Sequence, residues 1–268
     1  MMKDRLTMVI HSCDKFSDLW DTHMYLLNRN WTKRNIKTLL VTDKKNDRKY
    51  DNIQIISAGE GAELSERTEV ALRCINTEYV LITLDDYFPI YKINSKRIEH
   101  ILDEMEKYKL DYVRLFKRPD SKKKIPGSEN LYYIDLWSKK DSYYQVNLYV
   151  GIWRKSFLEK TIKEPLDAWN YELSLSKIAR EVKARCAMSK GKEFETLDVV
   201  RKGQILHKAN RYLKRHDLYH GSRTVISWKV EWRINILTFI KDHTPQIFVD
   251  WGKGILREKG QHFYSDQM

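Results

Sequence analysis

The 268-residue sequence has few cysteines and no long apolar run. Its three cysteines, Cys13, Cys74 and Cys186, are odd in number, lie far apart and lack the paired spacing of a metal site, so they indicate reduced thiols. The longest apolar runs, such as 79–84 and 234–240, are much shorter than the roughly 20 residues that span a bilayer. The N-terminus also lacks the apolar segment of a signal peptide. These absences predict a soluble, cytoplasmic protein.

The chain contains no internal repeat, low-complexity tract or linker that would divide it into independent domains. Its hydrophobic fraction of 42% is ordinary for a globular protein, and the length allows one large α/β domain to bury a substantial core. We therefore expect residues 1–200 to form that domain and residues 201–268 to form an extension packed on it.

Positive charge is concentrated at the C-terminal end. The net charge is +12, and residues 201–268 carry thirteen Lys and Arg against six Asp and Glu. The same segment is rich in aromatic residues: Trp228, Trp232, Phe239, Phe248, Trp251, Phe263 and Tyr264. Basic residues interleaved with aromatics suit an anionic surface such as lipid headgroups, a pyrophosphate or nucleic acid. A solvated basic face over a packed aromatic core is the structural alternative.

Short apolar segments alternate with segments of helical periodicity along the first half of the chain. We expect strands at 6–11, 37–42, 53–57, 79–84 and 112–116, and helices at 16–29, 62–75 and 95–108. Strands that alternate with helices imply a mainly parallel sheet with right-handed crossovers. The predicted fold class is thus α/β, with helices flanking a central sheet and a helical, basic C-terminal region.

The most informative feature is an apolar run, Tyr79–Leu84, that ends in the adjacent carboxylates Asp85 and Asp86. The run is rich in Val, Ile and Leu without alternation, which is typical of a strand covered on both faces. In open α/β folds, the C-terminal ends of such strands form the ligand site. Two neighbouring carboxylates repel each other, and a Mg²⁺ or Mn²⁺ ion bound with a substrate phosphate would explain the pair. A turn after the strand is the structural alternative.

Three segments, taken with this order of strands and helices, give the sequence a resemblance to the GT-A (Rossmann-like) glycosyltransferases of bacterial capsule and lipopolysaccharide synthesis. They are the strand end His11–Asp14, the segment Ser65-Glu66-Arg67, and the acidic Asp85–Phe88. The resemblance implies a hexosyltransferase that uses a nucleotide-sugar donor, most often a UDP-sugar. The usual acidic motif of these enzymes is Asp-X-Asp, whereas here the two carboxylates are adjacent.

The resemblance also implies roles for particular residues. Asp86 and Asp85 would bind the divalent cation, Mn²⁺ or Mg²⁺. The Gly-containing segment Val199–His207 would help to neutralise the leaving diphosphate, although simple surface charge is the alternative for its basic residues. The expected donor-binding residues are His11, Ser12, Asp14, Asp43, Arg67, Asp85, Asp86, Arg201, Lys202 and His207.

The catalytic base has no obvious Glu-Asp motif and must be sought near the aromatic residues that follow residue 146. In enzymes of this type a Trp and a nearby acidic residue often face the acceptor, which implies Trp153 and Trp169 as acceptor-binding residues. An inverting transfer needs a carboxylate to take the proton of the acceptor hydroxyl. Glu172 is the first choice for this base and Asp167 the second. Helix capping is the competing explanation for both carboxylates.

The sequence therefore predicts an inverting glycosyltransferase whose acceptor is a bacterial surface polysaccharide or a lipid-linked oligosaccharide. Residues 1–200 would be its catalytic domain, and the extension could attach it to the anionic inner face of the membrane. A nucleotidyltransferase is one alternative, but the segment 11–16 lacks the Gly-rich loop of that class. A non-catalytic nucleic-acid-binding protein is another, although charge alone supports it and it leaves the acidic pair unexplained.

Overall fold

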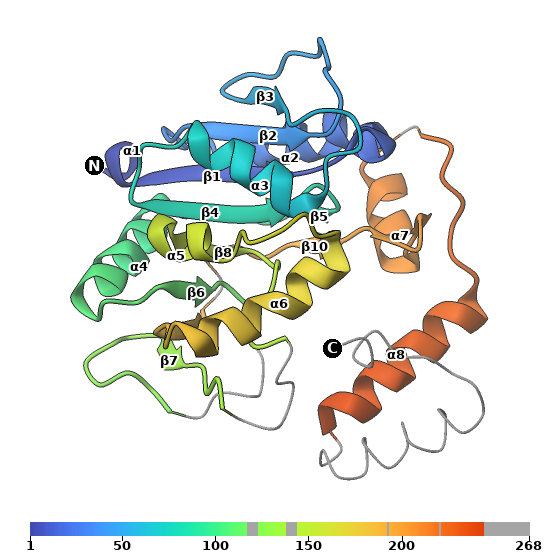
Figure 1. The fold of residues 1–268 in the computed structure, drawn as a ribbon. Coiled ribbons are helices and arrows are strands. Elements are labelled where there is room, and N and C mark those ends of the chain that lie inside the picture. The colour runs from blue at the N-terminus through green and yellow to red at the C-terminus, as the bar shows by residue number, and fades with distance from the viewer. Residues whose placement is uncertain (117–122, 138–143, 192, 220, 244–268) are drawn as a thin grey trace.

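The computed structural model describes residues 1–116, 123–137, 144–191, 193–219 and 221–243. An eight-stranded sheet forms its centre, with strand order β3-β2-β1-β4-β8-β6-β9-β7 (Figure 1). Its strands are β1 (Leu6–His11), β2 (Thr38–Thr42), β3 (Gln54–Ser57), β4 (Tyr79–Leu84), β6 (Tyr112–Arg114), β7 (Leu131–Tyr133), β8 (Gly151–Arg154) and β9 (Cys186–Ser189).

The sheet has a parallel half and a mixed half. Strands β3, β2, β1 and β4 all run parallel, whereas β8 is antiparallel to both β4 and β6, and β7 is antiparallel to β9. The central strands β1, β2 and β4 are almost entirely buried because helices cover both faces, as their unbroken apolar sequences predict. The predicted α/β class is confirmed.

Helices cover both faces of the sheet. Helices α2 and α4 share one hydrophobic core with the residues of β1 that point to their side, and α3, α5 and α6 share the second core on the opposite face. Bounds of the helices in these two layers are α2 (Trp20–Asn30), α3 (Leu64–Arg73), α4 (Ser95–Lys107), α5 (Lys155–Lys160) and α6 (Ala168–Glu181). Two short helices, α1 (Met2–Arg5) and the 3-10 helix η1 (Asp14–Leu19), flank β1.

The expected elements differ from the observed ones mainly at their ends. Strand 79–84 has the predicted bounds, but the predicted helix 16–29 begins with η1, and the predicted strand 112–116 pairs only over 112–114. Strands β7, β8 and β9 were not expected, because buried strands of three or four residues show no periodicity.

The segment after β9 folds over the end of the sheet. Strand β10 (Leu197–Asp198) pairs with β5 (Tyr87–Phe88), and a two-residue turn joins β11 (Val200–Arg201) to β12 (Gln204–Ile205). Together with α7 (His207–Arg215), these strands bury a third hydrophobic cluster that includes Phe88. Residues 201–215 therefore pack on the preceding part of the chain.

Helix α8 (Trp228–His243) follows α7 and stands apart from the sheet (Figure 1). Its residues Trp228, Trp232 and Phe239 are exposed. Nowhere in the described part of the chain is a helix both long enough and apolar enough to cross a membrane. The expected aromatic residues Phe248, Trp251, Phe263 and Tyr264 lie outside the described residues.

Candidate functional site

The C-terminal ends of β1, β2 and β4 meet at one edge of the sheet. Because these strands are parallel and in register, His11 at the end of β1 is paired with Leu84 at the end of β4. Asp43 directly follows β2, and Asp85 directly follows β4. Strands β5 and β10 and helix α7 lie beyond this same edge (Figure 1). The fold thus brings together polar residues that are far apart in the sequence.

Asp85 is buried and fixed by a network of hydrogen bonds. The Ser12 hydroxyl donates to the carboxylate of Asp85, and Trp20 Nε1 donates to Ser12 Oγ over 2.6 Å. The His23 ring contacts the backbone oxygen of Asp85, with 2.9 Å between Nδ1 and O. Burial raises the pKa of Asp85 to about 7, although the hydrogen bonds from Ser12 and Trp20 favour its charged form. These contacts make Asp85 a rigid support for the residue that follows it.

Asp86 has a buried carboxylate oxygen, Oδ1, without a hydrogen-bond partner. Burial raises its pKa well above the ordinary range, and the charges of Asp85 and Asp198 raise it further. A buried polar atom of this kind costs free energy unless something absent from the protein chain satisfies it. Asp86 is therefore the residue at this edge that is best placed to receive a ligand.

Asp198 is the functional candidate that sequence reasoning missed. Strand β10 places it opposite Tyr87, and the Val199 amide donates to the backbone oxygen of Asp86 over 3.0 Å. Burial raises the pKa of Asp198, against the effect of Arg201, whose Nη2 donates to Asp198 Oδ2 over 2.8 Å. We call Asp85, Asp86 and Asp198 the acidic cluster.

The acidic cluster has the chemistry of a partial cation site. Carboxylate oxygens are the ligands that Mg²⁺ and Mn²⁺ prefer, and the partnerless oxygen of Asp86 could accept such an ion. Among the residues that the structure describes, no three His, Cys, Asp or Glu side chains are grouped as metal ligands. The residues present fit a cation that takes its other ligands from a bound phosphate and from water.

Arg67 and the segment 13–14 lie beside the acidic cluster. Arg67 Nη1 donates to the Ser12 backbone oxygen over 2.5 Å, while its buried Nε has no partner. The Asp14 amide donates to Asp43 Oδ1 over 2.6 Å. Burial works to raise the pKa of Asp43, but this hydrogen bond and others outweigh it and lower the pKa. The predicted residues Asp14, Asp43 and Arg67 are thus neighbours in the structure.

Two of the expected donor-binding residues, His11 and Ser12, have buried side chains. The side chain of His11 is buried, its Nε2 lies 3.3 Å from Thr68 Oγ1, and burial lowers its pKa to about 3, so it contacts the core. Ser12 is also buried, and its hydroxyl is bonded to Asp85 and Trp20. Both side chains thus form hydrogen bonds within the protein, and donor binding at this strand end stays a prediction.

The basic segment 201–207 is divided between two locations. Arg201 contacts the acidic cluster through Asp198, whereas Lys202 is exposed in the turn between β11 and β12. His207 stacks on Trp228, with ring centroids 3.6 Å apart, and its amide donates to Glu231 over 3.1 Å. His207 therefore joins α7 to α8, and of these three residues Arg201 lies closest to the predicted phosphate site.

The two candidate bases differ in their surroundings. Asp167 is the N-cap of α6, where its Oδ1 accepts the Asn170 amide over 2.8 Å, so the capping explanation holds for this residue. Glu172 lies one turn into α6, half-buried, and its Oε1 accepts the Leu148 amide over 3.1 Å. Its charge acts on Tyr87, the neighbour of Asp86. Leu148 is followed by Tyr149, whose ring stacks on Tyr87, so Glu172 lies near the same edge as the acidic cluster.

Trp153, an expected acceptor contact, lies inside the protein. Its ring is fully buried in the second core, between Tyr112 and Phe157, with centroids 4.4 and 5.7 Å away. Its register opposite Val80 in the middle of β4 explains this burial. Trp169, at the start of α6, is exposed and stays a candidate.

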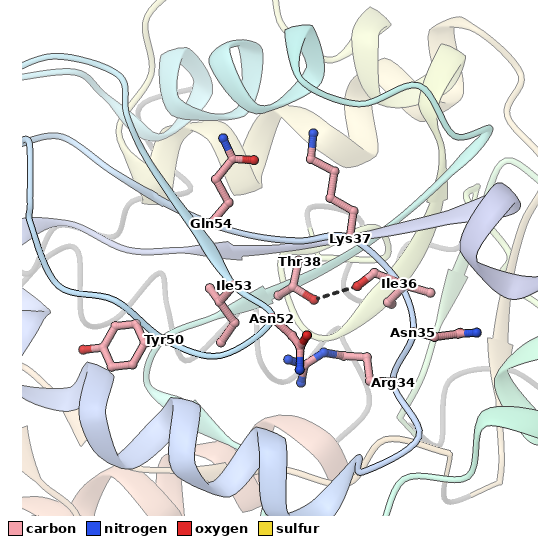
Figure 2. A pocket seen from close by; sticks show the side chains of 9 residues that line it. All are labelled: Arg34, Asn35, Ile36, Lys37, Thr38, Tyr50, Asn52, Ile53 and Gln54. Atoms are coloured by element: carbon pink, nitrogen blue, oxygen red, sulfur yellow. Dashed lines mark hydrogen bonds between the residues drawn. The ribbon is translucent and has the colours of Figure 1, made fainter.

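A cavity of about 530 Å³ lies at the other end of the parallel strands, where β2 and β3 begin (Figure 2). Arg34 lines it, with Nε and Nη1 buried without partners, and burial lowers the pKa of its guanidinium to about 10. None of the predicted site residues lines this cavity, and it is separated from Asp86 by the length of the sheet. We therefore do not place the donor there.

Comparison with known proteins agrees with this architecture. No protein-family model and no curated protein matches the sequence. Among solved structures, S. aureus TarS 1-349 in complex with UDP-GlcNAc matches with a TM-score of 0.52 and 17% identity, over 75% of this chain and 60% of that one. The UDP complex of the same protein matches with a TM-score of 0.50 and 14% identity, over 71% and 59%. The chain spans about three-fifths of these structures, and at such low identity the likeness establishes that it has the fold of GT-A-like glycosyltransferases.

Proposed function

We propose that this protein is a glycosyltransferase that moves a hexose from a nucleotide-sugar donor, most often a UDP-sugar, to a saccharide acceptor. The observation that carries the proposal is the partnerless, buried carboxylate oxygen of Asp86 at the end of β4. Beside it lie two more carboxyl groups whose pKa burial raises, those of Asp85 and Asp198. A cation bound with the donor diphosphate would satisfy this cluster in the fold where such donors bind.

A divalent cation, Mn²⁺ or Mg²⁺, would be held by Asp86, supported by Asp85, and would neutralise charge on the donor diphosphate. Among the residues that the structure describes, Arg67 carries a positive charge that acts on Asp85, and Arg201 carries one that acts on Asp86. They would orient the diphosphate and stabilise the charge that it gains as the leaving group. Asp14 and Asp43, which are joined by a hydrogen bond, would border the nucleoside.

Glu172 is our candidate for the base. Its half-buried carboxylate would take the proton of the acceptor hydroxyl as that oxygen forms a bond to the anomeric carbon and the bond from this carbon to the diphosphate oxygen breaks. The attack comes from the face opposite to the leaving group, so the transfer would be inverting. The hydrogen bond from the Leu148 amide would fix the carboxylate in position.

The acceptor would be a growing bacterial surface polysaccharide, of a capsule or lipopolysaccharide, or a lipid-linked oligosaccharide.

Helix α8 supports peripheral attachment to an anionic membrane, because Trp228, Trp232 and Phe239 are exposed on it beside the basic residues Lys229 and Arg233. Sedimentation with vesicles that contain phosphatidylglycerol should therefore weaken as salt rises from about 0.05 to 0.5 M, since salt screens such contacts. Equal binding to neutral and anionic vesicles at every salt concentration would contradict the proposed attachment to an anionic membrane.

A donor screen tests the proposed function. The melting temperature is measured with UDP-, GDP-, dTDP- and CMP-sugars, with and without Mn²⁺, because a ligand that binds the folded state raises stability by an amount set by its concentration over its dissociation constant. We expect one nucleotide to raise the melting temperature, more so with Mn²⁺, and to undergo slow hydrolysis. Failure of every nucleotide sugar to shift the melting temperature would contradict the proposal.

A further inference from the structure

Three aromatic rings stack at the site edge. Tyr87 in β5 lies nearly parallel to Tyr149, with centroids 4.6 Å apart and an interplanar angle of 15°. Phe116 packs on Tyr149 with centroids 4.4 Å apart and an angle of 40°. The rings come from three segments: β5, the residues after β6 and the residues before β8. We call these three residues the aromatic stack.

The aromatic stack connects the acidic cluster to the candidate base. Tyr87 directly follows Asp86, and Tyr149 directly follows Leu148, whose amide donates to Glu172. The charges of both Asp86 and Glu172 act on Tyr87. A molecule that reacts between the donor diphosphate and the base must therefore approach this stack.

The stack does not belong to the interior of the protein. Each ring is half-buried, and within the described part of the chain none of the three is a member of the hydrophobic clusters that hold the sheet, the helices and α7 together. Aromatic rings that leave some of their surface at a recessed edge are typical of ligand sites. Packing of the core thus does not explain why these side chains are large and aromatic.

The Tyr87 hydroxyl adds a polar group to this surface. It forms no hydrogen bond with any residue that the structure describes, and the side chain is half-buried. A tyrosine hydroxyl can both donate to and accept from the hydroxyl of a ligand.

We propose that Tyr87, Tyr149 and Phe116 form the acceptor subsite and select a neutral saccharide by its ring. The apolar C–H face of a pyranose would stack on the rings, and the Tyr87 hydroxyl would bond to one of the sugar hydroxyls. A phosphate has no apolar C–H face to stack on these rings, and an acidic peptide would be repelled by Glu172. The assignment to the acceptor rests on the proposed function, whereas saccharide binding by the stack can be measured without it.

Saturation-transfer NMR with neutral disaccharides tests the subsite directly. Lactose, maltose, cellobiose and diacetylchitobiose are the probes, with and without UDP and Mn²⁺. We expect ring C–H signals from at least one probe, a roughly tenfold weaker dissociation constant in Tyr149→Leu, and a roughly fivefold weaker one in Tyr87→Phe. The matched control is Tyr25→Leu, an exposed tyrosine of α2, which should leave binding unchanged.

The outcomes separate the subsite from the proposed function. If no disaccharide contacts the protein, or if Tyr87→Phe and Tyr149→Leu bind as tightly as the wild type, the subsite is wrong even where UDP still binds. If none of the nucleotide sugars in the donor screen binds while a disaccharide contacts the stack, the glycosyltransferase function fails and the saccharide subsite stands. Tyr87→Phe removes one oxygen without a partner, so it keeps the test valid if Tyr149→Leu does not fold.

Discussion

The carboxyl groups on the two sides of the site have different environments. Around the end of β4, Asp85, Asp86 and Asp198 are drawn together in a buried setting that raises their pKa values, and Asp86 leaves an oxygen without a partner. In α6, Asp167 and Glu172 each accept a backbone amide. The first arrangement destabilises the protein unless a cation binds, whereas the second can be maintained without a ligand.

This difference suggests two separate kinds of role. The acidic cluster is arranged to bind charge, so its removal should affect donor binding. Glu172 is already oriented by the Leu148 amide, so its removal should affect the chemical step. Substitutions on the two sides should therefore separate binding from turnover.

The largest effect is expected for Asp86→Asn. The substitution keeps the size of the side chain but removes the charge that would hold a cation and the donor diphosphate, so transfer should fall by at least about 10³. Donor turnover with Mn²⁺ measures it, and Asp85→Asn is the control, expected to lose less because Asp85 is bonded to Ser12. Equal loss of transfer in the two variants would contradict the assignment of Asp86 as the cation ligand and of Asp85 as its support.

Glu172→Gln should lower turnover by a factor on the order of 10² to 10⁴ with donor affinity little changed. Glutamine can still accept the Leu148 amide but cannot take a proton. Steady-state kinetics and UDP titration on the same sample separate the two quantities. Normal turnover in this variant would mean that the base lies elsewhere or that the reaction is retaining.

Asp85 should make stability depend on pH. Its folded pKa of about 7 lies above the ordinary 3.8, so the folded state holds an extra proton between these values and loses stability as pH rises through this window. Asp85→Asn cannot ionise, so its stability relative to the wild type should grow from pH 4 to pH 8 by at most about 4 kcal/mol. Urea unfolding of both proteins at several pH values measures this difference. A stability difference between the two proteins that does not change with pH would contradict the raised pKa of Asp85.

The smallest effect is expected for Asp167→Ala. Loss of the N-cap of α6 should reduce the free energy of unfolding by about 1 kcal/mol without changing turnover at permissive temperature. Thermal unfolding and an activity assay on the same sample check this. A large loss of turnover at unchanged stability would instead make Asp167 the base.

The parallel half of the fold could be predicted from the sequence, and the acidic pair at its edge with it. Strand 79–84 was correct to the residue because a buried central strand is a continuous apolar run. The position of Trp153 was not predictable, because its burial depends on the antiparallel pairing of β8 with β4, which no local pattern reveals. Asp198 was missed for the same reason, since only the pairing of β10 with β5 brings it to Asp86.

Calorimetric titration with UDP tests the central claim that the acidic cluster binds a nucleotide diphosphate with a divalent cation. The wild type and Asp86→Asn are compared in the presence and absence of Mn²⁺, at matched ionic strength. We expect the wild type to bind UDP at least tenfold more tightly with Mn²⁺, and Asp86→Asn to lose this gain while remaining folded. UDP affinity that is the same in both proteins and indifferent to Mn²⁺ would contradict the claim.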